Sequence, residues 1–310
     1  MIETISELRQ AVRRIRGGST AAAAEGAATD AADVATDAAD AHSNTGAAIA
    51  LVPTMGALHD GHLALVRRAR ELGEVVVSIF VNPLQFSPTE DLARYPRTLQ
   101  ADLAVLAAEG IHTVFVPTAT ELYPAGRPQT LVDAGEIGNR YDGAARPGHF
   151  DGMLTVVAKL LNVVQPDYAL FGQKDAQQAF LVQQMVCDLN FPVAIEVVPT
   201  VRAADGLALS SRNRYLKPAE RRAALALSVA LAAAASEAGH GVAAALSAAH
   251  AVLTLEPAVK LDYLVAVNPH TFLPVDGRYR GQARLLLAAR VGRTRLIDND
   301  TITIPSERPA

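Results

Sequence analysis

Between residues 47 and 198 the chain alternates short apolar runs with segments of helical periodicity. The runs are close to continuously apolar, which is typical of strands that are buried on both faces of a sheet. The helical segments between them complete β-α-β units, in which neighbouring strands run parallel. The pattern therefore predicts an α/β fold with a Rossmann-like parallel sheet, whose strands are expected at 47–52, 75–81, 113–116, 168–171 and 193–198.

This rhythm ends near Pro199, and a different pattern follows. It contains two Ala-rich helical segments and then three strand-like segments, expected at 218–238, 241–255, 260–267, 284–289 and 293–297. The sequence therefore predicts a second, smaller α+β domain. We expect the Rossmann-like domain to span 1–200 and a smaller α+β lid domain to span 201–310.

The N-terminal part carries apolar residues at helical spacing over residues 2–16, which predicts an amphipathic first helix. From 17 to 46 the composition narrows mainly to Ala, Asp, Thr, Gly and Ser. So little apolar surface can be buried there that we expect a low-complexity linker inserted into the larger domain. We assign this linker no function.

Composition and charge restrict the class of protein. The 310 residues are 50% hydrophobic, and the formal net charge is −4 with a pI of about 6.1. The apolar content suffices for a packed core, while the charge gives no basic footprint for nucleic acid. The single Cys187 excludes an intramolecular disulfide and is expected to be a small core residue. Without a basic leader or an apolar stretch of membrane-spanning length, we expect a cytoplasmic protein with no membrane contact.

The residues 53–62, Pro-Thr-Met-Gly-Ala-Leu-His-Asp-Gly-His, follow the first predicted strand and precede a helix. Asp60 is expected to cap that helix, whose exposed N–H groups and positive dipole end lie beside His62. His59 and His62 can donate hydrogen bonds to a polyphosphate, and Gly61 leaves room for a base or ribose. The pattern resembles the His-x-Gly-His signature of the nucleotidyltransferase superfamily, which includes class I aminoacyl-tRNA synthetases. A structural histidine pair and a zinc site are the alternatives, and the lack of nearby cysteine in the sequence disfavours zinc.

Polar residues also follow the other predicted strands, at the edge where open α/β sheets bind their ligands. Asn82 and Gln85 come after the second strand, although Gln85 could equally be an ordinary loop residue. After the fourth strand, Lys174 can meet phosphate charge and Asp175 can accept hydrogen bonds from ribose hydroxyls. The alternative for these two residues is a solvated ion pair on a helix face.

Further candidates surround the same edge. Gly172 permits close approach of a ligand to the backbone, and either Gln177 or Gln178 can face the crevice. Arg146 and His149 lie in a Gly- and Pro-rich section, where they could serve a phosphate or a carboxylate, or equally be surface residues.

After the fifth strand, the segment 202–213 contains an Asp-Gly turn followed by hydroxyls and a guanidinium. Such a loop can fold over a triphosphate. Ser210 and Ser211 supply small donors, and Arg212 supplies a fixed fork of charge.

Taken in order, five motifs resemble those of the pantothenate synthetase (pantoate–β-alanine ligase) family. The resemblance runs from about Ile49 to Ile297, and five ordered motifs are far more specific than any one of them. They are PTMGALHDGH at 53–62, FVNPLQF at 80–86, YPRT at 95–98, FGQKD at 171–175 and LSSRN at 209–213. Two positions depart from the family pattern, because Gln173 stands where many relatives have Glu and Ala176 where an aromatic residue is usual.

The resemblance implies ATP-dependent condensation of pantoate with β-alanine through an enzyme-bound pantoyl adenylate, with release of pyrophosphate and AMP. Such chemistry needs positioning and positive charge more than a covalent nucleophile. The resemblance makes His62 the proton donor and His59 a phosphate contact, while Lys174 and Arg212 neutralise charge that grows on the phosphates. It also implies a homodimer, and Mg²⁺ carried mainly on the phosphates, with Asp102 as the acid near any metal.

Pantoate would be held by Gln85 and Gln178, with Gln85 also near β-alanine and Asn82 beside them. Two other functions stay open: a different His-x-Gly-His nucleotidylyltransferase that acts on a small acid or phosphate, and a non-catalytic nucleotide-binding protein. The first would not need the glutamine pair or the second domain, and the second has no evident use for so many groups aimed at phosphate charge. The ATP site implied by the resemblance consists of Met55, Gly56, His59, Gly61, His62, Gly172, Gln173, Lys174, Asp175, Val201, Leu209, Ser210, Ser211 and Arg212.

Overall fold

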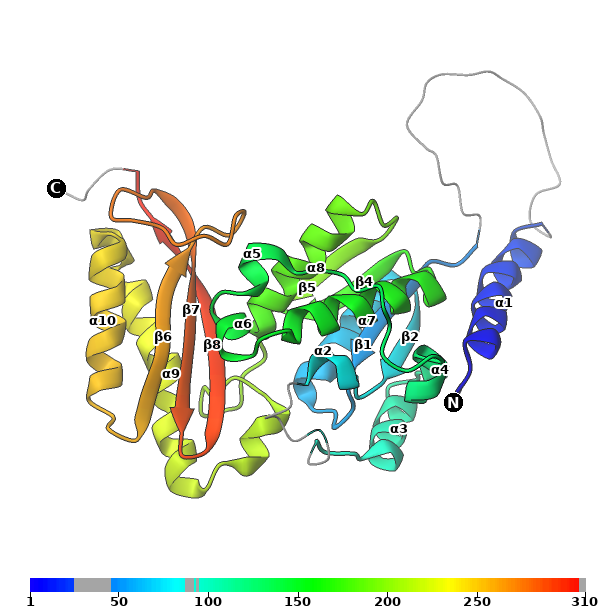
Figure 1. The fold of residues 1–310 in the computed structure, drawn as a ribbon, viewed down its shortest axis with the longest axis horizontal. Coiled ribbons are helices and arrows are strands. Elements are labelled where there is room, and N and C mark those ends of the chain that lie inside the picture. The colour runs from blue at the N-terminus through cyan, green and yellow to red at the C-terminus, as the bar shows by residue number, and fades with distance from the viewer. Residues whose placement is uncertain (25–45, 87–91, 93–94, 307–310) are drawn as a thin grey trace, which may run out of the picture.

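The structure, a computed structural model, describes residues 1–24, 46–86, 92 and 95–306. Its larger lobe, drawn in blue to green in Figure 1, is built on a five-stranded parallel sheet. The strand order of this sheet is β3-β2-β1-β4-β5. Its strands are β1 (Ile49–Thr54), β2 (Glu74–Ile79), β3 (Thr113–Phe115), β4 (Tyr168–Gly172) and β5 (Ala194–Val198). A three-stranded antiparallel sheet forms the smaller lobe, with β6 (Val259–Val267), β7 (Gly281–Val291) and β8 (Thr294–Ile304). The predicted fold class is confirmed.

Helices cover both faces of the parallel sheet. One face packs against α1 (Ile5–Ala24), α7 (His149–Val164) and α8 (Ala176–Asp188), and the other against α2 (Asp60–Leu72) and α3 (Leu99–Ala108). Along β1, Ile49 and Leu51 join the first core while Ala50 and Val52 join the second, as the period of two in a strand requires. Three short helices lie between β3 and α7, namely α4 (Ala119–Leu122), α5 (Gly135–Gly138) and α6 (Asp142–Ala145).

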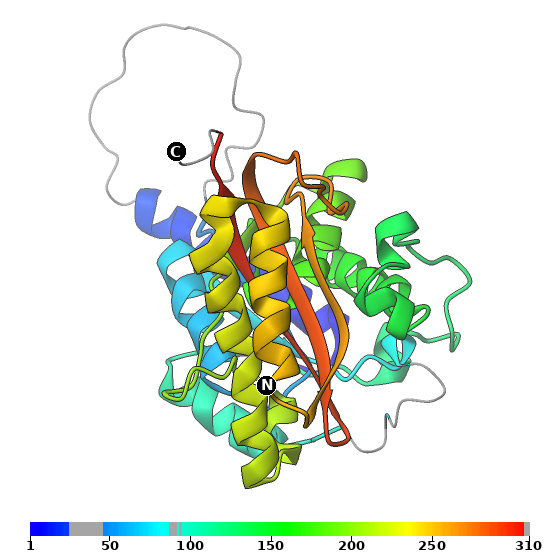
Figure 2. The same ribbon diagram turned by 90° about the vertical axis from the view of Figure 1, so that its left-hand side faces the viewer.

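The antiparallel sheet is covered on its outer face by α9 (Pro218–Glu237) and α10 (Val242–Thr254), as Figure 2 shows. The segment 218–240 is long and apolar enough to cross a membrane by length and composition alone. This corrects the expectation that no stretch reaches that length. Residues such as Leu227 and Leu231 pack into the core between α9 and the sheet, which accounts for the apolar composition of the helix.

Three details differ from the sequence-based expectation. Helix α1 continues to Ala24, because its last residues are alanines that favour helix, and residues 25–45 of the expected linker lie outside the described residues. Helix α7 begins at His149, four residues before its expected start at Met153, so His149 lies in the first turn. Cys187 is exposed rather than buried, because it lies beyond Met185, the last buried residue of α8.

The two lobes are joined by specific contacts. Phe272 stacks on Phe180 with ring centroids 4.7 Å apart, and its carbonyl accepts a hydrogen bond from the Tyr141 hydroxyl at 3.0 Å. Arg295 on β8 forms an ion pair with Asp142 on α6 at 2.6 Å. These contacts fix how the smaller lobe faces the edge of the parallel sheet, while the domain boundary at residue 200 stays a prediction.

Candidate active site

A cavity of about 230 Å³ lies at the C-terminal edge of the parallel sheet, where the loops after β1 and β4 diverge. The sheet extends from β1 through β2 and β3 in one direction and from β4 through β5 in the other, so this is the switch point at which such sheets bind ligands. Most of the predicted site residues line this cavity. They are Met55, His59, Gly61, His62, Gln85, Gly172, Lys174, Asp175, Gln178, Val201, Leu209, Ser210, Ser211 and Arg212.

Asp102, at the start of α3, holds the loop that carries the histidines. Its Oδ2 accepts from the Ala57 N–H and its Oδ1 from the Leu58 N–H, both at 2.9 Å, and the Thr98 hydroxyl donates to both oxygens at 3.1 Å. Asp102 is 3% exposed and does not line the cavity. The structure therefore gives Asp102 the role of a loop anchor, and its place near a metal stays a prediction. Gly56 does not line the cavity either. Its φ of +79° turns the chain there, and a Cβ at this position would lie 3.0 Å from Asp102 Oδ2, so glycine is favoured for the backbone.

His59, and not Asp60, caps helix α2, since Asp60 is already the first helical residue. His59 Nδ1 accepts from the Gly61 N–H at 3.1 Å, and His62 Nδ1 accepts from the His59 N–H at 3.3 Å. Because each Nδ1 is an acceptor, each neutral ring carries its proton on Nε2. Gly61 is required here, since a Cβ at that position would lie 2.9 Å from the His59 ring. The capping interaction thus fixes both imidazoles as Nε2–H donors.

The charge of the site is set by burial. Burial, together with the neighbouring His59, lowers the pKa of His62 to about 3, and burial and the charge of Lys174 also lower the pKa of His59. Both rings are therefore neutral at pH 7. Burial alone would raise the pKa of Asp175, but the charges of Lys174, whose Nζ is 3.4 Å away, and of Arg212 hold it below its usual value. Positive charge in the cavity is consequently carried by lysine and arginine rather than by histidine.

Gln85 ends the 3₁₀ turn η1 (Pro83–Gln85) and lines the cavity. Its Nε2 lies 3.2 Å from Met55 Sδ, and its Oε1 accepts from Asn82 Nδ2 at 3.1 Å. Asn82 is 1% exposed and also accepts from the Tyr123 hydroxyl at 2.8 Å. Asn82 therefore lies behind Gln85 and orients it, and it does not line the cavity as the sequence suggested.

The two glutamines that open α8 have different roles. Gln177 is 4% exposed, and its amide accepts from the Asp142 N–H at 3.1 Å and donates to the carbonyls of Ile137 and Arg140 at 2.7 and 2.9 Å. It therefore holds the short helices before α7 in place. Gln178 is the one of these two that lines the 230 Å³ cavity.

The site also includes three residues to which the sequence assigned no definite role, namely Tyr95, Arg146 and His149. His149 Nδ1 lies 2.8 Å from the Gln85 carbonyl, and its Nε2 lies 2.8 Å from Arg146 Nη1, so the ring links the arginine to the glutamine turn. Tyr95 hydrogen bonds to Ser211 and lines the cavity. Its signal in the sequence is the YPRT motif, which marks the position but not the contact.

Strand β8 of the smaller lobe holds both loops that carry phosphate-binding candidates. Asn299 Nδ2 donates to the carbonyls of Gln173 and Lys174 at 2.9 and 3.0 Å, and the side chain of Gln173 faces this strand instead of the cavity. The adjacent Asp298 accepts two hydrogen bonds from Arg202, at 2.6 and 2.9 Å, in the segment that leads to Ser210 to Arg212. Asp298 and Asn299 are 3% and 4% exposed. The smaller lobe is thus part of the frame of the site.

Replacing Asn299 by aspartate should lower kcat/KM for ATP on the order of tenfold, because a carboxylate cannot donate to the two carbonyls that it would face. Steady-state kinetics measures this loss, and circular dichroism checks the fold. Asn162→Asp is the matched control, since Asn162 donates to a carbonyl at 2.9 Å on an exposed face of α7. A folded Asn299→Asp variant with wild-type kcat/KM would contradict the positioning role.

Comparison with known proteins identifies the family. The profile of the family described as pantoate-beta-alanine ligase matches residues 27–301. The chain belongs to this family. The pantothenate synthetase of Leifsonia xyli subsp. xyli is 61% identical over 259 residues, which cover 83% of this chain and 90% of that relative.

Two solved structures of the family resemble the fold described above. Pantothenate synthetase from Thermus thermophilus has a TM-score of 0.82 at 44% identity, and the match covers 96% of this chain and 98% of that one. Pantoate-beta-alanine ligase from Francisella tularensis, complexed with beta-gamma ATP and β-alanine, has a TM-score of 0.67 at 36% identity and covers 82% and 89% of the two chains. Family membership makes the chain a ligase. The alternatives of a nucleotidylyltransferase and of a non-catalytic nucleotide-binding protein are not retained.

Proposed function

We propose that this ligase, which condenses pantoate with β-alanine at the expense of ATP, works through a pantoyl adenylate formed in the cavity between β1 and β4. One observation carries the proposal. The cavity that Gln85 and Gln178 line is also lined by His59, His62, Lys174 and Arg212. Donors and cations for phosphate and amides for a hydroxy acid are thus placed at one switch point. The Francisella complex with beta-gamma ATP and β-alanine supports the choice of ligands.

In the first step, a carboxylate oxygen of pantoate attacks the α-phosphorus of ATP. A new O–P bond forms as the bond to the departing pyrophosphate breaks, so negative charge grows on the phosphate oxygens. The Nε2–H groups of His62 and His59 donate to these oxygens from neutral rings, and Lys174 and Arg212 supply the opposing charge. His62 is more deeply buried than His59, and we assign it the role of main hydrogen-bond donor to the growing charge on that basis.

In the second step, the amine of β-alanine attacks the carbonyl carbon of the adenylate. The C–O bond to AMP breaks, and the amine releases a proton to water. Gln85 lines the cavity, and its backbone carbonyl contacts the ring of His149. We assign Arg146 to the β-alanine carboxylate, because a guanidinium fork suits a carboxylate in this position. His149, whose two ring nitrogens contact Arg146 and the Gln85 carbonyl, positions the arginine.

Magnesium fits the site as an ion carried on phosphates. Asp175 is the one carboxylate among the described residues that line the nucleotide cavity, and the described residues contain no cluster of three or more potential metal ligands. Such a donor set suits Mg²⁺ that binds substrate phosphates and keeps several waters. Such an ion would neutralise phosphate charge, and Asp175 is the residue that would hold it.

We also propose that the protein is a homodimer and that it is located in the cytoplasm. Both proposals rest on the family resemblance. Sedimentation velocity of the purified protein tests the dimer through its mass in solution. Fractionation of cells that express the protein tests the location.

Detection of AMP from purified protein with ATP, Mg²⁺ and pantoate, with and without β-alanine, tests the reaction. The adenylate route predicts pantoate-dependent exchange of pyrophosphate into ATP without β-alanine, and AMP together with pantothenate when both acids are present. Stoichiometric formation of pantothenate without any exchange would contradict the adenylate. Binding of ATP without exchange or AMP would overturn the whole assignment.

Replacing Gln178 by alanine should raise KM for pantoate on the order of tenfold while KM for ATP changes much less, because the lost amide belongs to the hydroxy-acid end of the site. Steady-state kinetics with each substrate varied in turn gives both constants. The matched control is Gln184→Ala, at an exposed position of the same helix. Equal effects on pantoate and ATP would move Gln178 out of the pantoate site.

A further inference from the structure

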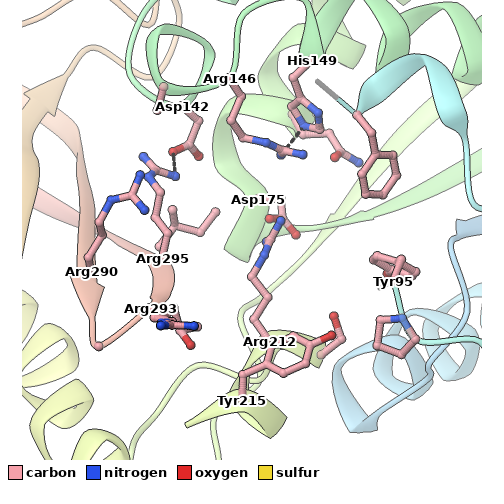
Figure 3. Close-up of a pocket in the computed structure, with 18 of the residues that line it drawn as sticks. Tyr95, Asp142, Arg146, His149, Asp175, Arg212, Tyr215, Arg290, Arg293 and Arg295 are labelled. Atoms are coloured by element: carbon pink, nitrogen blue, oxygen red, sulfur yellow. Dashed lines mark hydrogen bonds and ion pairs between the residues drawn. The ribbon is translucent and has the colours of Figure 1, made fainter. Parts of the chain in front are cut away.

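A second cavity of about 910 Å³ opens beside the nucleotide cavity, between the two lobes. Its walls are the turn between β7 and β8, the turn η4 (Ser211–Tyr215) and the first turn of α7. The two cavities are continuous, and Arg212 belongs to both. They share eight lining residues, namely Phe86, Tyr95, Arg146, His149, Asp175, Gln178, Ser211 and Arg212. Figure 3 shows Arg290, Arg293 and Arg295 on one side of this space, with Arg212 toward its centre.

Cations predominate in the walls of this cavity. Five arginines and one lysine line it against three carboxylates, in a chain whose formal net charge is −4. One carboxylate, Asp142, is already paired with Arg295 at 2.6 Å. Among the described residues, neither Arg212 nor Arg293 forms an ion pair. The excess of positive charge is therefore a local property of this cavity.

The β7–β8 hairpin carries this charge at a cost to its own stability. The register places Arg290 directly opposite Arg295, and like charges in that position destabilise a strand pair. Asp262 on β6 offsets part of the repulsion, with its carboxylate 2.7 Å from Arg295 Nε and 3.8 Å from Arg290 Nε. The second arginine of this pair therefore does not serve the stability of the hairpin, which points to a role in binding an anion.

The turn of the β7–β8 hairpin packs closely against the start of α9. Gly292 has a φ of +59°, and a Cβ at that position would collide with the carboxylate of Glu220 at the start of α9. Arg293 follows directly and lines the cavity. The backbone that carries Arg293 is thus held against α9, and its guanidinium is presented at the rim of the cavity.

We propose that Arg290 and Arg293, with Arg212 from the turn η4, form a site for pyrophosphate as it leaves the nucleotide cavity. This inference rests on the proposed function, in which pyrophosphate departs from the α-phosphorus beside Arg212. Guanidinium forks match the oxygens of a diphosphate, and a positive wall raises the local concentration of an oligoanion. Arg290 and Arg293 line only the second cavity, so both can be replaced without removing a group that lines the nucleotide cavity.

The test compares Arg293→Gln and the double variant Arg290→Gln/Arg293→Gln with Arg278→Gln, an exposed arginine of the same lobe that lines neither cavity. Calorimetric titration with magnesium pyrophosphate, without nucleotide, gives Kd directly, and product inhibition against ATP gives the inhibition constant during turnover. We expect pyrophosphate to bind about fivefold more weakly to the single variant and about tenfold more weakly to the double variant. The Arg278→Gln protein should match wild type.

An unchanged pyrophosphate Kd in the double variant would overturn the proposal. Parallel losses in pyrophosphate affinity and in KM for ATP would also overturn it, because the arginines would then hold the triphosphate of the incoming nucleotide. A larger loss for pyrophosphate than for ATP supports it. The proposed function is tested separately. It would be wrong if the wild-type protein bound pyrophosphate but formed no pantothenate.

Discussion

Replacing His62 by alanine should lower kcat by roughly 100-fold or more in a protein that remains folded. His62 donates from Nε2–H, and its other nitrogen is already used by the His59 N–H at 3.3 Å. A preorganised donor in a cavity shielded from water contributes a few kcal/mol to the stabilisation of growing charge. Coupled detection of AMP under saturating substrates measures kcat, and circular dichroism confirms that the variant is folded.

Two further variants separate the catalytic role of His62 from its part in the helix cap. In His62→Asn the side-chain oxygen can replace Nδ1 as the acceptor for the His59 N–H, while the donor at the position of Nε2 is lost. In His62→Gln an amide N–H can reach toward the position of Nε2. We expect the asparagine variant to be stable and about as slow as alanine, and the glutamine variant to recover part of the activity. A fast His62→Asn enzyme would contradict the assignment.

The low pKa of His62 also predicts how the stability of the protein depends on pH. The folded-state pKa of about 3 lies below the ordinary value of 6.5, so between these values the unfolded chain binds a proton that the folded chain excludes. The contribution of His62 to stability is therefore complete above pH 6.5 and is lost as the pH falls toward 3. Urea unfolding of wild type and His62→Gln across this range should show a smaller loss of stability in the variant.

The sequence was sufficient to place the parallel sheet and the edge that carries the site. Apolar runs such as that of β2 are local signals, and the rule that ligands bind beyond the strand ends converts them into positions for His62 and Lys174. The smaller lobe was also foreseen, because its two Ala-rich helices and three strands are separate local patterns. These predictions needed only the order of elements along the chain.

The contacts that orient the site were not accessible in the same way. Asn82 follows a strand end like Gln85, but its burial behind Gln85 depends on Tyr123, which lies 41 residues away. Asn299 reaches Gln173 across 126 residues, and nothing local distinguishes it from an exposed strand residue. The hairpin arginines have the same ambiguity, since charges on a strand of an antiparallel sheet usually face water. Such roles are set by the packing of the two lobes.

Removing the carboxylate of Asp102 should destabilise the protein by about 2–4 kcal/mol, because the buried N–H groups of Ala57 and Leu58 would lose their acceptor. Urea unfolding of Asp102→Ala without Mg²⁺ or ATP measures this loss. Asp102→Asn should lose less, since its amide retains one acceptor oxygen. The matched control is Asp133→Ala, where an exposed carboxylate accepts from the Gly135 N–H at 2.6 Å and its loss should cost under about 0.5 kcal/mol.

The same variants decide between the anchor role and the metal role that the sequence suggested for Asp102. An anchor acts in the protein alone, so the stability loss must appear without metal, and kcat must fall because the loop that presents His59 and His62 is no longer held. A metal ligand would instead leave the unfolding curve of the metal-free protein unchanged and raise the Mg²⁺ concentration needed for half-maximal activity. Because both oxygens of Asp102 already accept backbone N–H groups, we expect the first result. Unchanged stability of metal-free Asp102→Ala, with an increased Mg²⁺ requirement, would return Asp102 to the metal site.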